Sequence, residues 1–470
     1  MKVQLTFEGA AGTVTGSKSL LTRGPKGVLV DAGLFQGLKR LRLRNWAKPG
    51  YDPKKIESVL LTHCHLDHSG WLPRLVSLGF QGHVFATPAT IDLCAILLAD
   101  SARLQEEDAK YANRKGFSKH KPALPLYTEA EAEKAVRRMR PVEFDVWTDV
   151  ADGIRARWHN SGHILGAAFI ELKINAGDEE IGVVFSGDLG RYDVPLHIDP
   201  EPRPACDVLV IESTYGNRTH THVDLDTQFI DVFGETLERG GVVLIPAFAV
   251  GRSQLLALVL RRLMKAGRLP KVPIHVDSPM ATRATAVYSK YLDAQNVDED
   301  VFEDGRRRLF PDTVKLHVSA AESKRLNELD GPFVLIAGSG MLSGGRILHH
   351  IRQRGGDPKN LLCLSGYQAE GTRGRHLIEG TRKLRIHGRD YPIRAQVTTL
   401  KGLSGHADAD ELMRWVSGAP TTPSAIFVNH GEPKSIDALA KRLHEETGAW
   451  THPAALNERF DLASLVRKGK

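Results

Sequence analysis

The sequence predicts an α/β protein with two domains, or with one domain that carries a large insertion. Its 470 residues exceed the roughly 250–300 that a single hydrophobic core usually serves. The first half alternates strand-like apolar runs with glycine turns, and from about Gly241 the pattern changes to repeated strand, loop and helix units. Such units are typical of a doubly wound parallel sheet.

The first half contains strand-like runs at residues 28–33 and 181–188, each with two valines and closed by a glycine turn. Between them, a segment rich in Ala, Leu, Glu and Arg predicts a helix over about 90–114. A second helix is expected to begin after Thr128, because Glu131 three residues later completes a capping box.

The second half predicts three strand-and-helix pairs. These are 242–245 with 253–264, 274–276 with 279–291, and 334–337 with 346–352. After the apolar run that ends at His430, only about forty residues remain. They suffice for a helix at 435–447 and a short strand pair, and not for a further domain.

Composition restricts the class of protein. Lys and Arg (63) exceed Asp and Glu (56), giving a formal net charge of +7 that weakly favours a polyanionic partner. No apolar stretch approaches the roughly twenty residues of a membrane helix, and the N-terminus lacks a signal-peptide pattern, so we expect a cytoplasmic protein. Four scattered cysteines argue against a disulfide framework.

The most informative segment lies just after the apolar run 56–61. Four potential metal ligands fall within six residues there: His63, His65, Asp67 and His68. Divalent zinc accepts neutral imidazole nitrogen and carboxylate oxygen directly, whereas an ordinary loop gains nothing from this crowding. Cys64 lies among these residues but need not point in their direction.

Two further candidates follow strand-like runs. His163 stands in a Ser-Gly-His turn and Asp188 in a Ser-Gly-Asp turn. Each turn alone is common. Together with the first cluster they supply enough ligands for two metal sites.

Asp31, the H-x-H-x-D-H cluster, His163 and Asp188 follow one another as do the motifs of the metallo-β-lactamase superfamily, which this chain resembles. Residues 212–216 (ESTYG), 403–408 (LSGHAD) and 428–432 (VNHGE) are similar to motifs A, B and C of the β-CASP nucleases. The resemblance implies an αββα metallo-β-lactamase domain formed by residues 1–213 and 395–470. A β-CASP domain with the doubly wound sheet, residues 214–394, would interrupt it.

The resemblance also implies two zinc ions, with manganese as the alternative metal, and a hydroxide between them. The residues would divide as follows: His63, His65 and His163 on the first metal, Asp67, His68 and His430 on the second, and Asp188 on both. Asp31 would orient a ligand rather than bind metal. Glu212 and His406 resemble the pair that protonates the leaving oxygen, so Asp67, His406 and Glu212 are the expected catalytic residues.

A glycine-rich loop precedes the helix expected at 346. Backbone N–H groups at a helix start attract phosphate, although an isolated glycine loop is as often structural. The expected RNA phosphate-binding residues are Gly338, Ser339, Gly340, Ser343, Gly344, Gly345 and Arg346, with Arg252 at the equivalent position of an earlier unit. Five histidines receive no role: His83, His197, His220, His275 and His387. His349 and His350 are adjacent on a helix and cannot easily chelate one metal.

The resulting hypothesis is a zinc-dependent ribonuclease that hydrolyses single-stranded RNA in RNA processing or decay, as an endonuclease and possible 5′-exonuclease. His430 favours RNA, because RNA-processing members of the resembled family carry histidine there. The alternatives are a hydrolase of DNA or of a small ester, and a non-catalytic RNA-binding subunit. The expected partner is single-stranded RNA and no membrane, and the oligomeric state stays open, with a homodimer among the choices.

Overall fold

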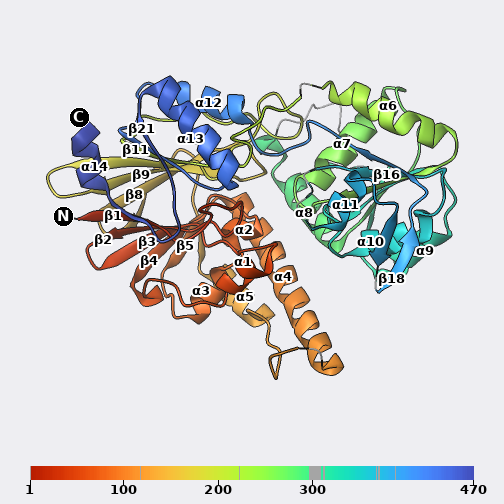
Figure 1. Ribbon diagram of the computed structural model, residues 1–470, viewed down its shortest axis with the longest axis horizontal. Helices are drawn as coiled ribbons and strands as arrows, with labels where there is room; N and C mark the ends of the chain where they lie inside the picture. The colour runs from red at the N-terminus through yellow and green to blue at the C-terminus, as the bar shows by residue number, and fades with distance from the viewer. Residues whose placement is uncertain are drawn as a thin grey trace. The chain divides into compact units, whose positions relative to one another are not determined.

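The computed structural model describes residues 2–116, 118–221, 223–295, 309–310, 313–366, 368, 371–386 and 388–469; His387 lies outside them. The chain forms two compact units. The first comprises Met1–Asp193, Asp199–Thr219 and His406–Lys470, and the second Val194–Ile198 and His220–Gly405. Figure 1 shows both units. The domain limits expected from the sequence, 213/214 and 394/395, stay a prediction.

The first unit contains a mixed seven-stranded sheet. In order across the sheet, its strands are β22 (Arg459–Asp461), β1 (Val3–Phe7), β2 (Ser19–Arg23), β3 (Lys26–Val30), β4 (Ile56–Leu60), β5 (His83–Ala86) and β6 (Met139–Pro141). β22, β1, β2 and β3 pair antiparallel, and β3 to β6 pair parallel. The parallel half sends the carboxyl ends of β3 and β4 to the same edge.

A second seven-stranded sheet belongs to the same unit. Its order is β21 (Trp450–Pro453), β20 (Ala425–Val428), β11 (Val208–Ile211), β10 (Glu180–Phe185), β9 (Ala168–Asn175), β8 (Ile154–Asn160) and β7 (Thr148–Ala151). Apolar side chains from both sheets, such as Leu5, Val28, Ile170 and Phe427, form one buried core. The two sheets therefore pack face to face.

Helices cover the outer faces of this sandwich. They are α1 (Lys39–Arg44), α2 (Leu66–Ser69), α3 (Leu72–Ser77), α4 (Pro88–Lys115), α5 (Glu129–Arg137), α12 (Ala409–Ser417) and α13 (Pro433–Thr447), with a 3₁₀ turn η1 (Pro53–Lys55). The last helix, α14 (Leu462–Gly469), instead contributes Leu462 and Val466 to the core between the two sheets. Side chains of α12 and α13 share a core with the second sheet, and α2 to α5 lie on the side of the first sheet (Figure 1). Helices α4 and α5 confirm the two predicted helices, and the Thr128–Glu131 capping box is present.

The two short strands expected near the end of the chain are present, but they do not pair with each other. β21 pairs with β20 in the second sheet, and β22 pairs with β1 in the first. The reason is physical: each strand finds free backbone groups at the edge of a different sheet, so the C-terminal segment extends both layers instead of forming a hairpin.

The second unit is built on a parallel six-stranded sheet. Its order is β14 (Val314–His317), β13 (Ile274–Asp277), β15 (Phe333–Gly338), β12 (Val242–Ala247), β16 (Leu361–Leu364) and β19 (Gln396–Thr399). The helices are α6 (Leu225–Glu238), α7 (Arg252–Lys265), α8 (Pro279–Lys290), α9 (Ala320–Arg325), α10 (Arg346–Arg354) and α11 (Arg373–Ile378), with 3₁₀ turns η2 (Leu292–Ala294) and η4 (Leu326–Glu328) and a hairpin of β17 (Lys383–Ile386) and β18 (Arg389–Pro392).

Strand order in this sheet reverses about β12, since β15 and β13 lie on one side and β16 and β19 on the other. That is the doubly wound arrangement. Together with the αββα sandwich it confirms the predicted fold class. Among the described residues, no helix is both long and apolar enough to cross a membrane.

Candidate metal centre

The expected ligands gather at strand ends of the first unit. Asp31 directly follows β3, His63 lies three residues after β4, and Asp188 lies three residues after β10. Glu212 directly follows β11, and His430 lies two residues after β20. Strands β10, β11 and β20 run parallel, so their carboxyl ends meet at one edge. The topology thus brings together residues that are up to 400 positions apart in the chain.

The first donor cluster contains His63, His65, His163 and Asp188. His65 Nδ1 lies 3.1 Å from His63 Nε2 and 3.2 Å from His163 Nε2. Asp188 Oδ2 lies 3.4 Å from His63 Nε2 and 3.6 Å from His163 Nε2. Tetrahedral zinc with ligands at about 2.0–2.1 Å separates neighbouring donor atoms by about 3.3–3.4 Å. The four donor atoms are therefore spaced as zinc requires.

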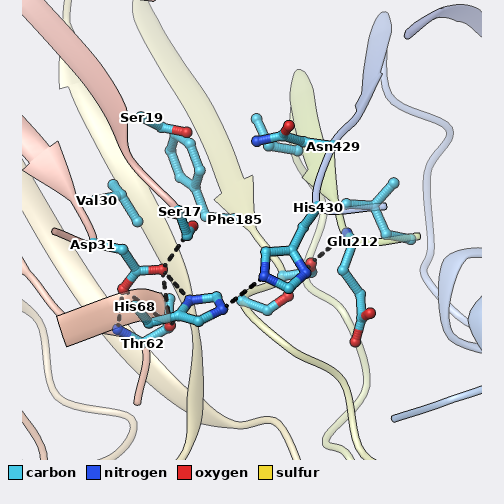
Figure 2. A pocket seen from close by; sticks show the side chains of 14 residues that line it. Ser17, Ser19, Val30, Asp31, Thr62, His68, Phe185, Glu212, Asn429 and His430 are labelled. Atoms are coloured by element: carbon cyan, nitrogen blue, oxygen red, sulfur yellow. Dashed lines mark hydrogen bonds and ion pairs between the residues drawn. The ribbon is translucent and has the colours of Figure 1, made fainter. Parts of the chain in front are cut away.

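The second donor cluster contains Asp67, His68 and His430. The two imidazoles face each other with Nε2 atoms 3.1 Å apart (Figure 2). Asp67 Oδ2 lies 3.7 Å from His430 Nε2. Because two ring nitrogens converge beside a carboxylate, this cluster also fits a divalent cation.

Asp188 stands between the clusters. Its Oδ2 faces the first cluster, while its Oδ1 lies 3.2 Å from His68 Nε2. Oδ1 is buried without a hydrogen-bond partner, and a buried carboxylate oxygen left in that state is costly. One metal on each side of Asp188 would satisfy both oxygens, so the residues present fit two metal ions.

Electrostatics favour a charged Asp188 surrounded by imidazoles. Burial opposes its ionisation, but His68, His430 and His63 hold the pKa of Asp188 well below its usual range. Burial lowers the pKa of both His63 and His65, which keeps these rings neutral. A neutral ring nitrogen offers the lone pair that a metal needs.

His68 differs from its neighbours because carboxylates flank it on two sides. Burial lowers its pKa, but Asp188 and Asp31 outweigh burial and hold that pKa well above the usual value. Asp31 Oδ2 lies 2.6 Å from His68 Nδ1 (Figure 2) and outside both donor clusters. Because Asp31 holds the ring by Nδ1, Nε2 is the His68 atom that would bind a metal.

Sequence reasoning gave Thr62 no role, yet it links several site residues. Its N–H donates to Asp31 Oδ1 at 2.9 Å, and its hydroxyl lies 3.0 Å from both Asp31 oxygens and 3.1 Å from His63 Nδ1. The only signal in the sequence was a hydroxyl residue directly before the histidine cluster. A small cavity of about 30 Å³ borders Thr62, Asp31 and His430, room for about one water molecule.

His406 and Glu212 form a pair beside the first cluster. His406 Nδ1 lies 3.2 Å from Glu212 Oε1 and 3.8 Å from Asp188 Oδ2, and its ring lies 4.6 Å from that of His163. The Glu212 carboxylate also accepts hydrogen bonds from the N–H groups of Leu189 and Thr214. Burial lowers the pKa of His406, but Glu212 and Asp188 raise it to about 9.

The expected phosphate-binding residues lie in the second unit, where the structure gives several of them other partners. Arg346 donates to Asp277 Oδ1 at 2.7 Å and to the Val318 carbonyl at 2.6 Å. Arg252 donates to the Ser365 carbonyl. The N–H groups of Ser343 and Gly344 donate to the Ser339 hydroxyl. The Arg346 guanidinium thus ties the start of α10 to the ends of β13 and β14, and phosphate binding by this set stays a prediction.

Two residues with potential donor atoms, His350 and Cys64, lie outside the two donor clusters. His350 Nε2 donates to Asp277 Oδ2 at 2.7 Å on the buried side of α10. Cys64 is buried, burial raises the pKa of its thiol, and it belongs to none of the donor clusters among the described residues.

Comparison with known proteins matches three family models in succession. Residues 13–84 match the metallo-beta-lactamase superfamily, 253–377 the Beta-Casp domain, and 390–454 the Zn-dependent metallo-hydrolase RNA specificity domain. The chain is 38% identical to Ribonuclease TTHA0252 of Thermus thermophilus over 93% of this chain and 94% of that protein. It is 31% identical to the transcription termination factor FttA of Methanosarcina mazei over 96% of this chain and 71% of that protein.

A solved structure of a protein of unknown function from Enterococcus faecalis shares the fold, with a TM-score of 0.56, 13% identity and coverage of 98% of this chain and 100% of that one. The fold and the clustered donors define a metal-dependent hydrolase. With the relatives and family models above, the chain belongs to the β-CASP family of the metallo-β-lactamase superfamily. The predicted resemblance is confirmed.

Proposed function

We propose that the protein is a zinc-dependent ribonuclease that hydrolyses phosphodiester bonds of single-stranded RNA in RNA processing or decay. One observation carries the proposal: two buried donor clusters share Asp188 beside the His406–Glu212 pair. Two metals on a shared carboxylate are a recurrent solution for phosphodiester hydrolysis.

The ligands of the proposed metals follow the donor clusters. His63, His65, His163 and Asp188 would hold one ion, and Asp67, His68, His430 and Asp188 the other. Bound there, the ions would supply Lewis acidity, lowering the pKa of water and polarising a phosphate oxygen. Five imidazoles among seven ligands favour zinc over manganese, which prefers oxygen donors.

The chain's own residues supply the remaining chemistry. Asp31 holds His68 by Nδ1, which fixes the ring so that Nε2 faces the centre. Glu212 does the same for His406 and stabilises its protonated form, because Glu212 and Asp188 together raise the His406 pKa to about 9 despite burial. A protonated His406 at neutral pH suits a general acid that gives its proton to the departing oxygen.

The choice of RNA as substrate rests on relatives and on His430. A relative with near-complete coverage is named a ribonuclease, and residues 390–454 match a model described by RNA specificity. His430 stands where RNA-processing family members carry histidine and faces His68 at 3.1 Å. DNA or a small ester is the alternative substrate.

End-labelled and internally labelled RNA and matched DNA, at equal salt, test the proposal together with elemental analysis. We expect about two zinc ions per chain and much faster cleavage of RNA. Asp188→Ala should lose both metals and activity, whereas Asp178→Ala, at an exposed carboxylate of the same unit, should lose neither. Equal rates on DNA would overturn the substrate assignment, and full metal content without cleavage would support a non-catalytic subunit.

A further inference from the structure

Helix α1 and its flanks carry a dense positive charge that the metal centre does not use. Five cations lie between residues 37 and 51, with no carboxylate among them, in a chain of net charge +7. They are Lys39, Arg40, Arg42, Arg44 and Lys48, all exposed. Such density draws polyanions toward a surface.

The helix itself does not account for these charges. Lys39 and Arg40 lie in the first turn, where the helix dipole disfavours a cation, and the N-cap Leu38 offers no side-chain hydrogen bond. Within the described part of the chain, Lys39, Arg40 and Arg42 have no ion pair. These charges therefore lower the stability of the helix, and no ion pair within the described residues offsets that loss.

Large apolar side chains alternate with the cations. Leu38, Leu43 and Trp46 are 53%, 56% and 47% exposed, while Leu41 alone on the helix is half-buried. At 100° per residue, Leu43 projects about 40° from Lys39, between Lys39 and Arg40. A helix that lies on a membrane separates its apolar from its charged face, and α1 does not.

The patch is rigidly joined to the turn that carries the metal ligands. The Asn45 side chain bonds both the N–H and the carbonyl of Phe35, at 2.9 and 2.7 Å, and Trp71 Nε1 donates to the Asn45 carbonyl. One residue before Phe35, Leu34 donates to the carbonyl of Leu66, beside Asp67. Helix α1 thus keeps a fixed place relative to the centre within the first unit.

We propose that the α1 patch, defined as Lys39, Arg40, Arg42, Lys48 and Trp46, binds the single-stranded RNA beyond the scissile bond. Its cations would contact phosphates and the Trp46 indole would stack on a base, a combination that serves single strands of any sequence. The inference rests on the proposed function, since the ribonuclease centre supplies the polyanion that the charge complements.

The charge test uses Lys39→Gln, Arg40→Gln and Arg42→Gln combined, because glutamine is a good helix former. The matched control replaces three exposed lysines on other elements of the unit, Lys55, Lys134 and Lys441, with glutamine. Each phosphate contact to a single strand contributes about 0.7 to the salt slope of log binding constant. The α1 variant should lower that slope by about 2, and the control should not change it.

Cleavage gives a second readout. Bis(p-nitrophenyl) phosphate reports on the metal centre alone, so the ratio of kcat/KM on a 30-nucleotide RNA to that on this small ester should fall at least tenfold in the α1 variant at low salt. Metal content and melting temperature, measured on the same samples, establish that the variant is folded. An unchanged ratio and salt slope in a folded, RNA-cleaving protein would overturn the α1 proposal and leave the ribonuclease intact.

Trp46 supplies an independent arm. Trp46→Leu should weaken binding of unstructured RNA about tenfold or more, since stacking contributes about 1–3 kcal/mol per base. Trp450→Leu, at the other exposed indole named among the described residues, should not. If the α1 variants lost binding to phosphatidylserine vesicles while their RNA binding stayed unchanged, the patch would be a membrane-binding surface and the RNA assignment would be refuted. Wild-type protein that neither cleaves nor binds RNA would instead refute the proposed function.

Discussion

At the residue scale, the sharpest prediction concerns His406. Removing a general acid typically costs about 10²–10⁴ in rate, so His406→Ala should be crippled on ordinary RNA. A sulfur in place of the 3′-oxygen leaves as a stable thiolate and scarcely needs a proton. The variant should therefore recover on a 3′-thio substrate, measured as single-turnover rate on the two RNAs.

Asp67→Ala is the matched comparison, because loss of a ligand should impair cleavage of both substrates alike. Metal content of both variants must be determined in parallel. If His406→Ala keeps its metals but is equally slow on the two RNAs, general acid catalysis is the wrong role and positioning of the substrate replaces it.

Residue identities at the centre could be predicted because metal chemistry needs histidine and carboxylate in a spacing that ordinary loops rarely show. The hydrogen bonds that hold these ligands in place could not be predicted. Thr62 bonds Asp31 and His63, but a threonine just after a strand end carries no distinctive pattern. Arg346 is the opposite case, because its position beside a glycine loop predicted phosphate binding. In the structure its guanidinium donates to Asp277 instead.

At the element scale, close backbone approach fixes the turn that carries Asp67. A Cβ on Gly33 would lie 1.6 Å from the Asp67 carbonyl oxygen and 2.7 Å from the Ser17 nitrogen, so Gly33→Ala must displace the backbone. We expect a loss of about 3 kcal/mol or more in the free energy of unfolding and reduced metal content, checked by urea unfolding and elemental analysis.

Gly234 gives the opposite control. It lies inside α6, and a Cβ there would meet nothing within 4 Å. Gly234→Ala should raise the free energy of unfolding of the second unit by about 0.5–1 kcal/mol with metal content unchanged. A Gly33→Ala protein that binds two metals and unfolds at the wild-type urea concentration would contradict the close-approach argument.

Arg346 anchors α10 to the end of β13. Asp277 is fully buried and also bonds Ser323 and His350. Arg346→Ala should lower the free energy of unfolding by about 1.5–3 kcal/mol, the usual contribution of hydrogen bonds to a charged group, without loss of metal. Arg352→Ala, exposed on the same helix, should cost little. If Arg346→Ala kept the stability of the wild-type protein but bound RNA more weakly, Arg346 would instead have the phosphate-binding role.

Elements with local signals were predictable, and pairings were not. The capping box predicted α5 and the helical composition predicted α4. Both signals are local, because a helix is stabilised by residues within four positions of each other. Sheet membership depends on partners far along the chain: β22 pairs with β1 across more than 450 residues. No local pattern distinguishes that edge from the edge beside β20.

At the scale of the whole molecule, the chain leaves the first unit after Thr219 and returns at His406. The returning segment contributes His406, His430 and strands β20 to β22. The centre is therefore complete only when the C-terminal segment has joined both sheets of the first unit, which couples metal binding to closure of the fold.

This coupling predicts how the two units respond to metal removal. All seven proposed ligands belong to the first unit, so bound metal stabilises that unit alone, by about 4 kcal/mol per site when free metal exceeds the dissociation constant a thousandfold. In calorimetry, dialysis against EDTA should lower the melting temperature of one transition and leave the other in place, and added zinc should restore it. Gly234→Ala assigns the transitions, because it should move only the metal-independent one. If EDTA shifts neither transition, or shifts both equally, the metals are not confined to the first unit as proposed.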